Sequence, residues 1–347
     1  MSRRALLRIM LVPLALLVTA CGGTATTPTI STDRPGTATA GASSTADATA
    51  VVGSDDASAT RMIQHAAGET AIVGTPHRIV ALEWSFVEDL LALGVTPIGV
   101  ADVAGYNTWV HTSIPLPADV TDVGTRQEPS LESIAALEPD LILGVGFRHR
   151  PIYEQLSAIA PTLILDSELT DPSSSQFDVM QNELRTVAEA INRQEEAQVA
   201  LARLQDTFAA ARRQLEDAGL AGSSFVLVQA WTSQGTPQMR VFLSVSTAGR
   251  VLEELGLRNA WQGEFDPNGF NTVGIEALTT VDADVFLYMA QANDDPFTGV
   301  LADNPVWTAL PFVTEGHVYA IGGDVWPFGG PLSMQVLVER VVAALAP

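Results

Sequence analysis

The sequence predicts an α/β fold of two similar Rossmann-like lobes with parallel-type sheets, joined by a long helix, with a ligand cleft between the lobes. Three observations support this prediction. Short apolar runs alternate with amphipathic helical segments, which is typical of parallel strands covered by helices. One charged stretch with helical spacing, residues 176–218, interrupts this alternation. Residues 131–143 and 275–287 repeat the same order of apolar positions, which indicates a duplicated unit.

The first 20 residues, 1–20, have the pattern of an export signal. Arg3, Arg4 and Arg8 precede an apolar run, and small residues lead to Cys21, the single cysteine of the chain. A cysteine at this place, followed by two glycines, resembles a bacterial lipobox. It predicts cleavage before Cys21 and acylation of that residue, so we expect an extracytoplasmic protein anchored to the cell membrane by lipid. The paired arginines leave both general and twin-arginine export open.

Residues 21–68 are rich in Thr, Ala, Ser, Gly and Asp and contain no Phe, Trp or Tyr. Such a segment buries too little apolar surface to offset its ordering entropy, so a disordered tether is expected after the lipidated cysteine. The folded part then divides into an N-terminal lobe, a connecting helical segment and a C-terminal lobe, at residues 69–175, 176–218 and 219–347.

In the first lobe, short apolar runs bounded by turn residues predict strands at 78–82, 97–101, 141–145 and 162–165. Helical spacing of apolar residues predicts helices at 86–93, 131–137 and 152–159. Gly94 marks the end of the first of these helices. In the connecting segment, Asn192 stands either between two helices or at a kink.

The second lobe resumes the same alternation after Gly219. Strands are expected at 225–230, 284–289 and 317–321. Helices are expected at 251–255, 275–278 and 332–345. Within the repeat, Glu132 corresponds to Glu276 and Asp140 to Asp284. Ligands in such folds usually bind at the carboxyl ends of the strands, which places the cleft between the lobes.

The composition excludes several function classes. The formal net charge is -22, and all 18 basic residues are arginine. Such an acidic surface repels phosphate backbones, so nucleic-acid binding is not expected. Without lysine there is no phosphate-binding loop of the Walker type, and the motifs GxSxG and HExxH are also missing from the sequence. The five histidines lack metal-ligand spacing. We expect no enzyme, no cofactor and no direct metal site.

Four strings resemble the helix-linked substrate-binding proteins of ABC importers for ferric siderophores, corrinoids and haem. They are RIVALEWSFVEDLLALGVTPIGVAD (78–102), DVGTRQEPSLESIAALEPDLIL (122–143), LGLRNAWQGE (255–264) and NPVWTALPFV (304–313). The resemblance is greatest to ferric-hydroxamate and ferric-citrate binding proteins. It implies a monomeric lipoprotein that binds a ferric siderophore and delivers it to a permease driven by a cytoplasmic ATPase.

The resemblance, together with position after a strand for Trp84 and Trp231, implies a set of ligand-binding residues. They are Trp84, Trp109, Arg126, Phe147, Arg148, Trp231, Phe270, Trp326 and Phe328. Arg126 matches the arginine that hydrogen-bonds chelating oxygens in hydroxamate binders, a role that suits a permanently charged guanidinium fork. On its residues alone, Arg126 could instead pair with Glu128 or Asp122.

Some positions depart from the hydroxamate-binding pattern. Asn268 and Phe270 stand where that pattern has tryptophan and serine, and Phe147 stands where it has tyrosine. The string FRH and three nearby arginines, with Arg148 and Arg150 among them, are more similar to the ferric-citrate branch. A chelate of mixed citrate and hydroxamate type therefore stays open.

Glu132 and Glu276 occupy the positions that dock onto permease arginines in the family. A glutamate in a first helical turn also complements the helix dipole, and both roles are compatible. Two alternatives to a siderophore receptor remain: a corrinoid or haem receptor of the same fold, and a surface adhesin that reuses it.

Overall fold

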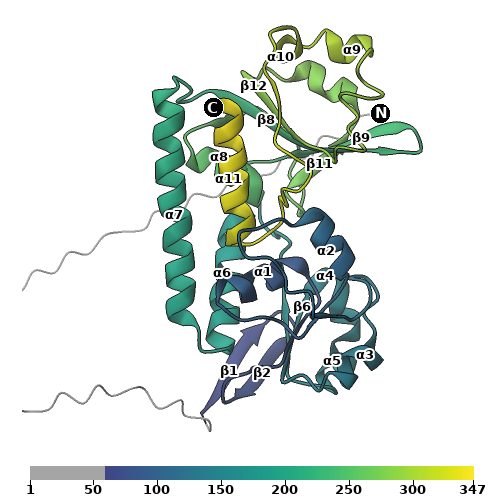
Figure 1. The fold of residues 1–347 in the computed structure, drawn as a ribbon, viewed down its shortest axis with the longest axis vertical. Helices are drawn as coiled ribbons and strands as arrows, with labels where there is room; N and C mark the ends of the chain where they lie inside the picture. Colours follow the sequence, from purple (N-terminus) through teal and green to yellow (C-terminus); the bar gives the residue numbers. More distant parts are fainter. Residues whose placement is uncertain (1–58) are drawn as a thin grey trace, which may run out of the picture. The chain divides into compact units, whose positions relative to one another are not determined.

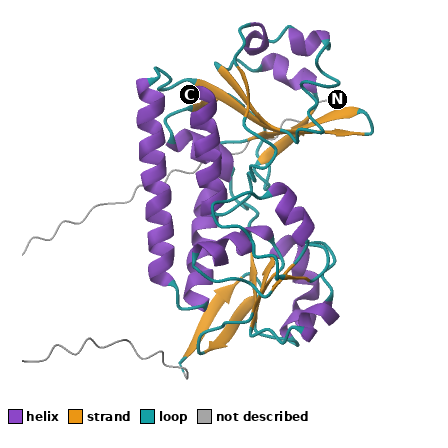
Figure 2. Cartoon of the chain, in the orientation of Figure 1, coloured by secondary structure: helices purple, strands orange, loops and turns teal. Residues whose placement is uncertain are grey.

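The computed structural model describes residues 59–347, which lie within one compact unit (Figure 1). The expected signal, the expected lipidation at Cys21 and most of the expected tether lie outside the described residues. Two lobes are each built around a sheet, and helices cover the sheets (Figure 2). Within residues 59–347, no helix is long and apolar enough to cross a bilayer.

The described chain opens with an antiparallel hairpin, β1 (Thr60–His65) and β2 (Gly68–Val73). The expected end of the tether at residue 68 is therefore wrong. Ile63 and Ile72 are buried in the core of the N-terminal lobe, and the backbone N–H of Ala66 donates to the carbonyl of Ile164. The hairpin buries only these two isoleucines among polar residues, and such a pattern is too weak to predict a strand from the sequence.

The N-terminal lobe contains a five-stranded sheet in the order β5-β4-β3-β6-β7, with every pair parallel. The strands are β3 (Ile79–Ala81), β4 (Gly99–Val100), β5 (Thr121–Asp122), β6 (Leu141–Val145) and β7 (Thr162–Leu165). The helices are α1 (Trp84–Ala92), α2 (Val103–Trp109), α3 (Leu131–Ala136), α4 (Gly146–His149) and α5 (Tyr153–Ser157). Strands β3, β6 and β7 are buried along their whole length, as their continuous apolar runs predict.

Two helices, not one, connect the lobes: α6 (Gln176–Ala190) and α7 (Gln194–Asp217). Asn192 has a φ of 55°, in the left-handed region that ends a helix, which explains the break between them. The C-terminal helix α11 (Pro331–Leu345) packs along α7 (Figure 1).

The C-terminal lobe contains a second sheet in the order β11-β9-β8-β12-β13, with β10 also paired to β8. The strands are β8 (Ser224–Ser233), β9 (Thr236–Phe242), β10 (Arg258–Asn259), β11 (Phe270–Val273), β12 (Val285–Met289) and β13 (Val318–Ala320). The other helices are α8 (Thr247–Glu254), α9 (Pro305–Thr308), α10 (Pro311–Thr314) and the 3-10 segment Ile275–Thr280.

The predicted fold class of two α/β lobes is confirmed, but the two sheets differ. Strands β8, β12 and β13 are parallel, whereas β9 and β11 run antiparallel to their neighbours. The sequence did not predict β9 and β11, because Gln238 and Arg240 interrupt the apolar run of β9.

The internal repeat has the same structural role in both lobes. Asp140 precedes β6 and accepts hydrogen bonds of 2.8 Å from the backbone N–H groups of His77 and Arg78, which lead into β3. Asp284 precedes β12 and accepts from the backbone N–H and hydroxyl of Ser224, at the start of β8. These bonds lower the pKa of Asp284. In each lobe a carboxylate thus ties together the starts of two neighbouring parallel strands.

Candidate ligand-binding cleft

A cavity of about 430 Å³ is lined by residues of both lobes and of helix α6. The lining residues are Glu83, Ser85, Arg126, Gln127, Val145, Phe147, Arg148, Ser167, Glu168, Gln176, Val179, Met180, Glu183, Arg240, Thr247, Asn268, Phe270, Trp326, Phe328 and Gly329. Several of them directly follow the carboxyl ends of strands β3, β6 and β7, where parallel sheets usually place ligands.

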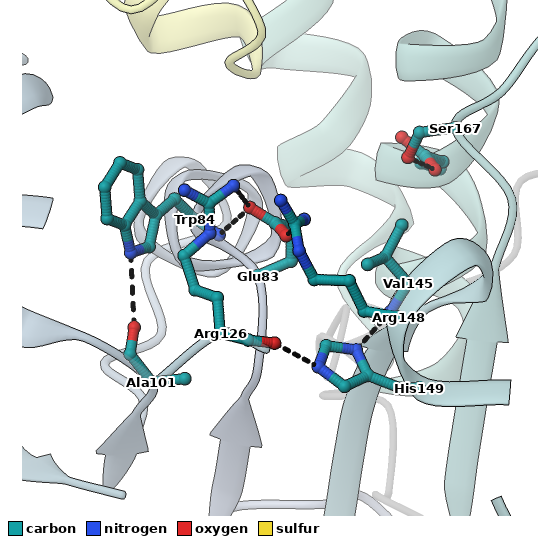
Figure 3. A network of polar contacts seen from close by, with 9 residues as sticks. Glu83, Trp84, Ala101, Arg126, Val145, Arg148, His149 and Ser167 are labelled. Carbon is teal, nitrogen blue, oxygen red and sulfur yellow. Dashed lines mark hydrogen bonds and ion pairs between the residues drawn. The ribbon is translucent and has the colours of Figure 1, made fainter. Parts of the chain in front are cut away.

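The N-lobe wall of this cavity contains three charged residues that contact one another, Glu83, Arg126 and Arg148 (Figure 3). One oxygen of the Glu83 carboxylate lies 2.5 Å from Nη2 of Arg126, and the other pairs with Nη1 of Arg148. The carboxylate also accepts from the backbone N–H of Trp84 at 3.1 Å, which caps the start of α1. A single buried carboxylate thus holds two arginines, and Arg126 pairs with neither of the surface acids that the sequence left open.

Trp84 lies beside this wall and is not among the residues that line the cavity, and its contact with a ligand stays a prediction. Its indole N–H donates to the carbonyl of Ala101 at 3.2 Å, which turns the ring into the core of the lobe. The guanidinium carbon of Arg126 lies 4.0 Å from the centre of the ring. Trp84 therefore supports Arg126 through a cation–π contact.

His149 fixes the segment that contains Arg126. Its Nδ1 accepts from the backbone N–H of Val145 at 3.0 Å, so Nε2 carries the proton and donates to the carbonyl of Arg126 at 2.9 Å. Burial lowers the pKa of the imidazole. Arg150, one residue further, bonds to Asp166 instead and does not line the cavity.

The C-lobe wall contains Arg240 and three aromatic residues, Phe270, Trp326 and Phe328, together with Thr247, Asn268 and Gly329. The ring centres of Trp326 and Phe328 lie 5.2 Å apart, and those of Phe270 and Phe328 lie 5.7 Å apart. All three rings line the cavity, and their contact with a ligand stays a prediction. Phe147, on the opposite lobe, also lines the cavity, and it is 48% exposed.

Two expected tryptophans do not line the cavity. Trp109 ends helix α2 and packs against the core of the N-terminal lobe, with its ring centre 6.5 Å from that of Trp326. Trp231 lies near the end of β8, where its ring centre is 4.9 Å from the guanidinium carbon of Arg240. Each ring packs against a lining residue, Trp326 or Arg240, and the direct contact of either tryptophan with a ligand stays a prediction.

Sequence analysis did not identify Arg240 as a site residue. Its Nη1 donates to Oε1 of Gln229, the cross-strand neighbour on β8, at 3.1 Å. The rings of Phe270 and Phe328 lie 4.8 and 5.8 Å from its guanidinium carbon. Burial lowers the pKa of this arginine. The only signal in the sequence was one charge within the apolar string QMRVF.

One buried carboxylate, that of Glu88, connects the N-terminal lobe to the segment that follows Trp326 and Phe328. Glu88, on α1, accepts from the backbone N–H groups of Gly330 and Ser333 at 3.1 and 2.9 Å and from the hydroxyl of Ser333 at 2.7 Å. It therefore caps α11 and fixes the segment that follows Trp326 and Phe328. Burial raises the pKa of Glu88 to about 7.

Two more acids lie near Glu88. Glu183, on α6, lines the cavity and accepts from the hydroxyl of Ser167 at 2.8 Å, and burial raises its pKa to about 7. The pKa of Asp89 is raised by burial and by the charges of Glu183 and Glu88. In the described part of the chain, Oδ1 of Asp89 has no hydrogen-bond partner.

Glu132 and Glu276 lie at corresponding places in the two lobes. Each is exposed and stands in the first turn of a short helix, α3 and the 3-10 segment respectively. Both side chains are therefore accessible to a partner. Their docking onto a permease stays a prediction.

Comparison with known proteins agrees with this geometry. Residues 79–325 match the model of a family described as periplasmic binding protein. The chain is 34% identical over 265 residues to the iron(3+)-hydroxamate-binding protein FhuD of Escherichia coli, covering 76% of this chain and 85% of that protein.

A second relative and a solved structure extend the comparison. The Fe(3+)-citrate-binding protein YfmC of Bacillus subtilis is 30% identical over 291 residues, with 84% of this chain and 87% of YfmC covered. The crystal structure of FhuD from Vibrio cholerae with bound Fe3+-Desferal has a TM-score of 0.70 and 29% identity, covering 78% of this chain and 99% of that one.

Proposed function

The chain belongs to the periplasmic binding protein family, and we propose that it is an extracytoplasmic receptor that binds a ferric siderophore in the cleft between its lobes. One observation supports this most strongly. Arg126 and Arg148 from the N-terminal lobe line the same cavity as Trp326 and Phe328 from the C-terminal lobe, and the guanidinium carbon of Arg126 lies 5.6 Å from the ring centre of Trp326. The receptor binds its ligand and releases it unchanged.

The chemistry of the walls suits a ready-made ferric chelate. Its chelating oxygens keep partial negative charge, and guanidinium groups donate charge-assisted hydrogen bonds to them. The aromatic rings offer rigid contact area to the organic part of the chelate. The cavity volume of about 430 Å³ lies within the usual range for small-molecule sites. A bare ferric cation would meet arginines, which repel it.

Delivery to a membrane partner follows from the exposed acids. Glu132 and Glu276 would each meet an arginine of an ABC permease, one from each lobe, which sets the orientation of the loaded receptor. A separate ATPase would drive uptake. Acylation of Cys21 would keep the receptor on the membrane surface near that permease.

The test is direct titration of the chain after its signal, with Cys21→Ser to prevent acylation. Tryptophan fluorescence is followed while ferrichrome, ferric citrate, ferric aerobactin, cobalamin and haemin are added in separate experiments. Saturable quenching by at least one ferric chelate is expected. Arg126→Ala should weaken that binding at least about 10-fold, since it removes charge-assisted hydrogen bonds.

Arg150→Ala is the matched control, because this arginine bonds to Asp166 outside the cavity and its loss should leave the affinity unchanged. Binding of cobalamin or haemin without any ferric chelate would replace the siderophore with a tetrapyrrole. Silence from all five ligands would contradict the receptor and favour the adhesin.

A further inference from the structure

The three arginines that line the cavity differ in how their charge is balanced. Arg126 and Arg148 share the carboxylate of Glu83, whose side chain is 8% exposed. These two charges are therefore partly compensated before any ligand arrives. Arg240 lies on the opposite wall and forms no ion pair within residues 59–347.

Three aromatic rings and one amide contact the guanidinium group of Arg240. Trp231, Phe270 and Phe328 lie within 4.8 to 5.8 Å of its guanidinium carbon. Its Nη1 bonds to the side-chain oxygen of Gln229, and its Nε is buried without a partner among the described residues. Of the five donors of a guanidinium group, the Nη donors other than the one bonded to Gln229 have no partner among the described residues and can meet a ligand in the cavity.

Other acids of the cavity do not compensate Arg240. Glu168 lines the cavity and is exposed, and Glu183 on α6 is occupied by the hydroxyl of Ser167. Neither forms an ion pair with Arg240. A desolvated cation without a carboxylate partner is costly, and an incoming anion removes that cost.

We propose that Arg240 binds a free anionic group of the ligand, so that the preferred siderophore is a ferric chelate with a carboxylate that does not coordinate the iron. The proposal rests on the proposed function of the cleft. On the N-lobe wall, arginines already compensated by Glu83 meet the weakly charged chelating oxygens. On the C-lobe wall, Arg240 meets the full charge of the carboxylate, with aromatic rings excluding water around the pair.

The experiment compares two ligands and two proteins by isothermal titration calorimetry. Ferrichrome is a neutral trihydroxamate chelate, and ferric aerobactin is a citrate dihydroxamate with carboxylates that stay off the iron. Arg240→Gln keeps a polar side chain and removes the charge. It should weaken binding of ferric aerobactin about 10-fold or more and change binding of ferrichrome less than about 2-fold, since only the first ligand offers a carboxylate.

Arg258→Gln is the control, because this exposed arginine on β10 does not line the cavity and should leave both affinities unchanged. Thermal unfolding establishes that each variant folds. Equal losses for both ligands, or no loss for ferric aerobactin, would overturn the role of Arg240 while the receptor stands. If the unchanged chain bound none of ferrichrome, ferric aerobactin and ferric citrate, the proposed function itself would be wrong.

Discussion

The two walls of the cleft present arginine in opposite ways. On the N-lobe wall, Glu83 lies between Arg126 and Arg148 and compensates part of their charge. On the C-lobe wall, Arg240 is surrounded by aromatic rings and bonds only to the amide of Gln229 within the described chain. The partners of an arginine, more than its presence, therefore decide which ligand group it can bind.

Of the substitutions considered, removal of the Glu83 carboxylate should have the largest effect on stability. Glu83→Gln leaves two mostly buried guanidinium groups without their carboxylate, and loss of one partner of a buried ion pair typically costs about 3 kcal/mol. We expect the free energy of unfolding to fall by roughly that amount in urea titrations. Glu128→Gln, at an exposed acid on the same loop as Arg126, is the matched control. A change under about 0.5 kcal/mol would mean that the pair contributes little to the fold.

The C-lobe wall depends on the N-terminal lobe through Glu88, whose removal should have the second largest effect. Glu88→Ala removes the acceptor of three hydrogen bonds from Gly330 and Ser333, so it should destabilise the fold by about 2–3 kcal/mol. The tryptophan emission should also shift to longer wavelength, because the segment of Trp326 loses its support. Ser333→Ala, which removes one donor, should have a smaller effect. Unchanged emission in Glu88→Ala would show that the aromatic segment is held by other contacts.

The stability of the fold should depend on pH through two buried carboxyl groups, those of Glu88 and Glu183. Glu88 and Glu183 have pKa values of about 7 in the folded chain and 4.5 as model groups. The folded state therefore keeps protons that the unfolded chain releases. Their contribution to stability is fully present below pH 4.5 and is lost as pH rises through about 7.

We expect the free energy of unfolding to fall between pH 5 and pH 8, by roughly 2 kcal/mol for each of the two carboxyl groups. Glu183→Gln should make this dependence shallower, because the amide does not titrate. The measurement is urea unfolding at a series of pH values. Stability that rises over this window in the unchanged chain would contradict the raised pKa values.

The smallest expected effect concerns one ring of the C-lobe wall. Phe328→Ala removes aromatic contact with the ligand and with Arg240, and a truncated contact ring typically costs about 1–2 kcal/mol of binding energy. The affinity for a ferric chelate should fall about 10-fold in calorimetric titration. Phe312→Ala, in the core of the same lobe and away from the cavity, should lower stability instead. An unchanged affinity in Phe328→Ala would remove this ring from the contact surface.

The sequence predicted the features that depend on neighbouring residues and missed those that depend on residues far apart in the chain. Strands β6 and β7 are short apolar runs and were predicted with their bounds. The hairpin β1–β2 was missed, since its sequence contains only two buried apolar residues, Ile63 and Ile72, and its other contacts are hydrogen bonds to distant segments such as that of Ala66 to Ile164. Glu83 was missed for a different reason: its role exists only because the fold brings residues 83, 126 and 148 together. Expected aromatics lay at or next to the cleft, but which of them line it depends on packing that no sequence pattern encodes.

The most direct test of the account is a crystal structure of the chain with a bound ferric chelate, with diffraction recorded at the iron absorption edge. We expect one anomalous peak within the cavity, between Arg126 and Arg240, with every iron-coordinating atom supplied by the chelate. An iron bonded directly to a protein carboxylate, such as Glu83 or Glu168, would contradict it. So would a peak outside the cavity.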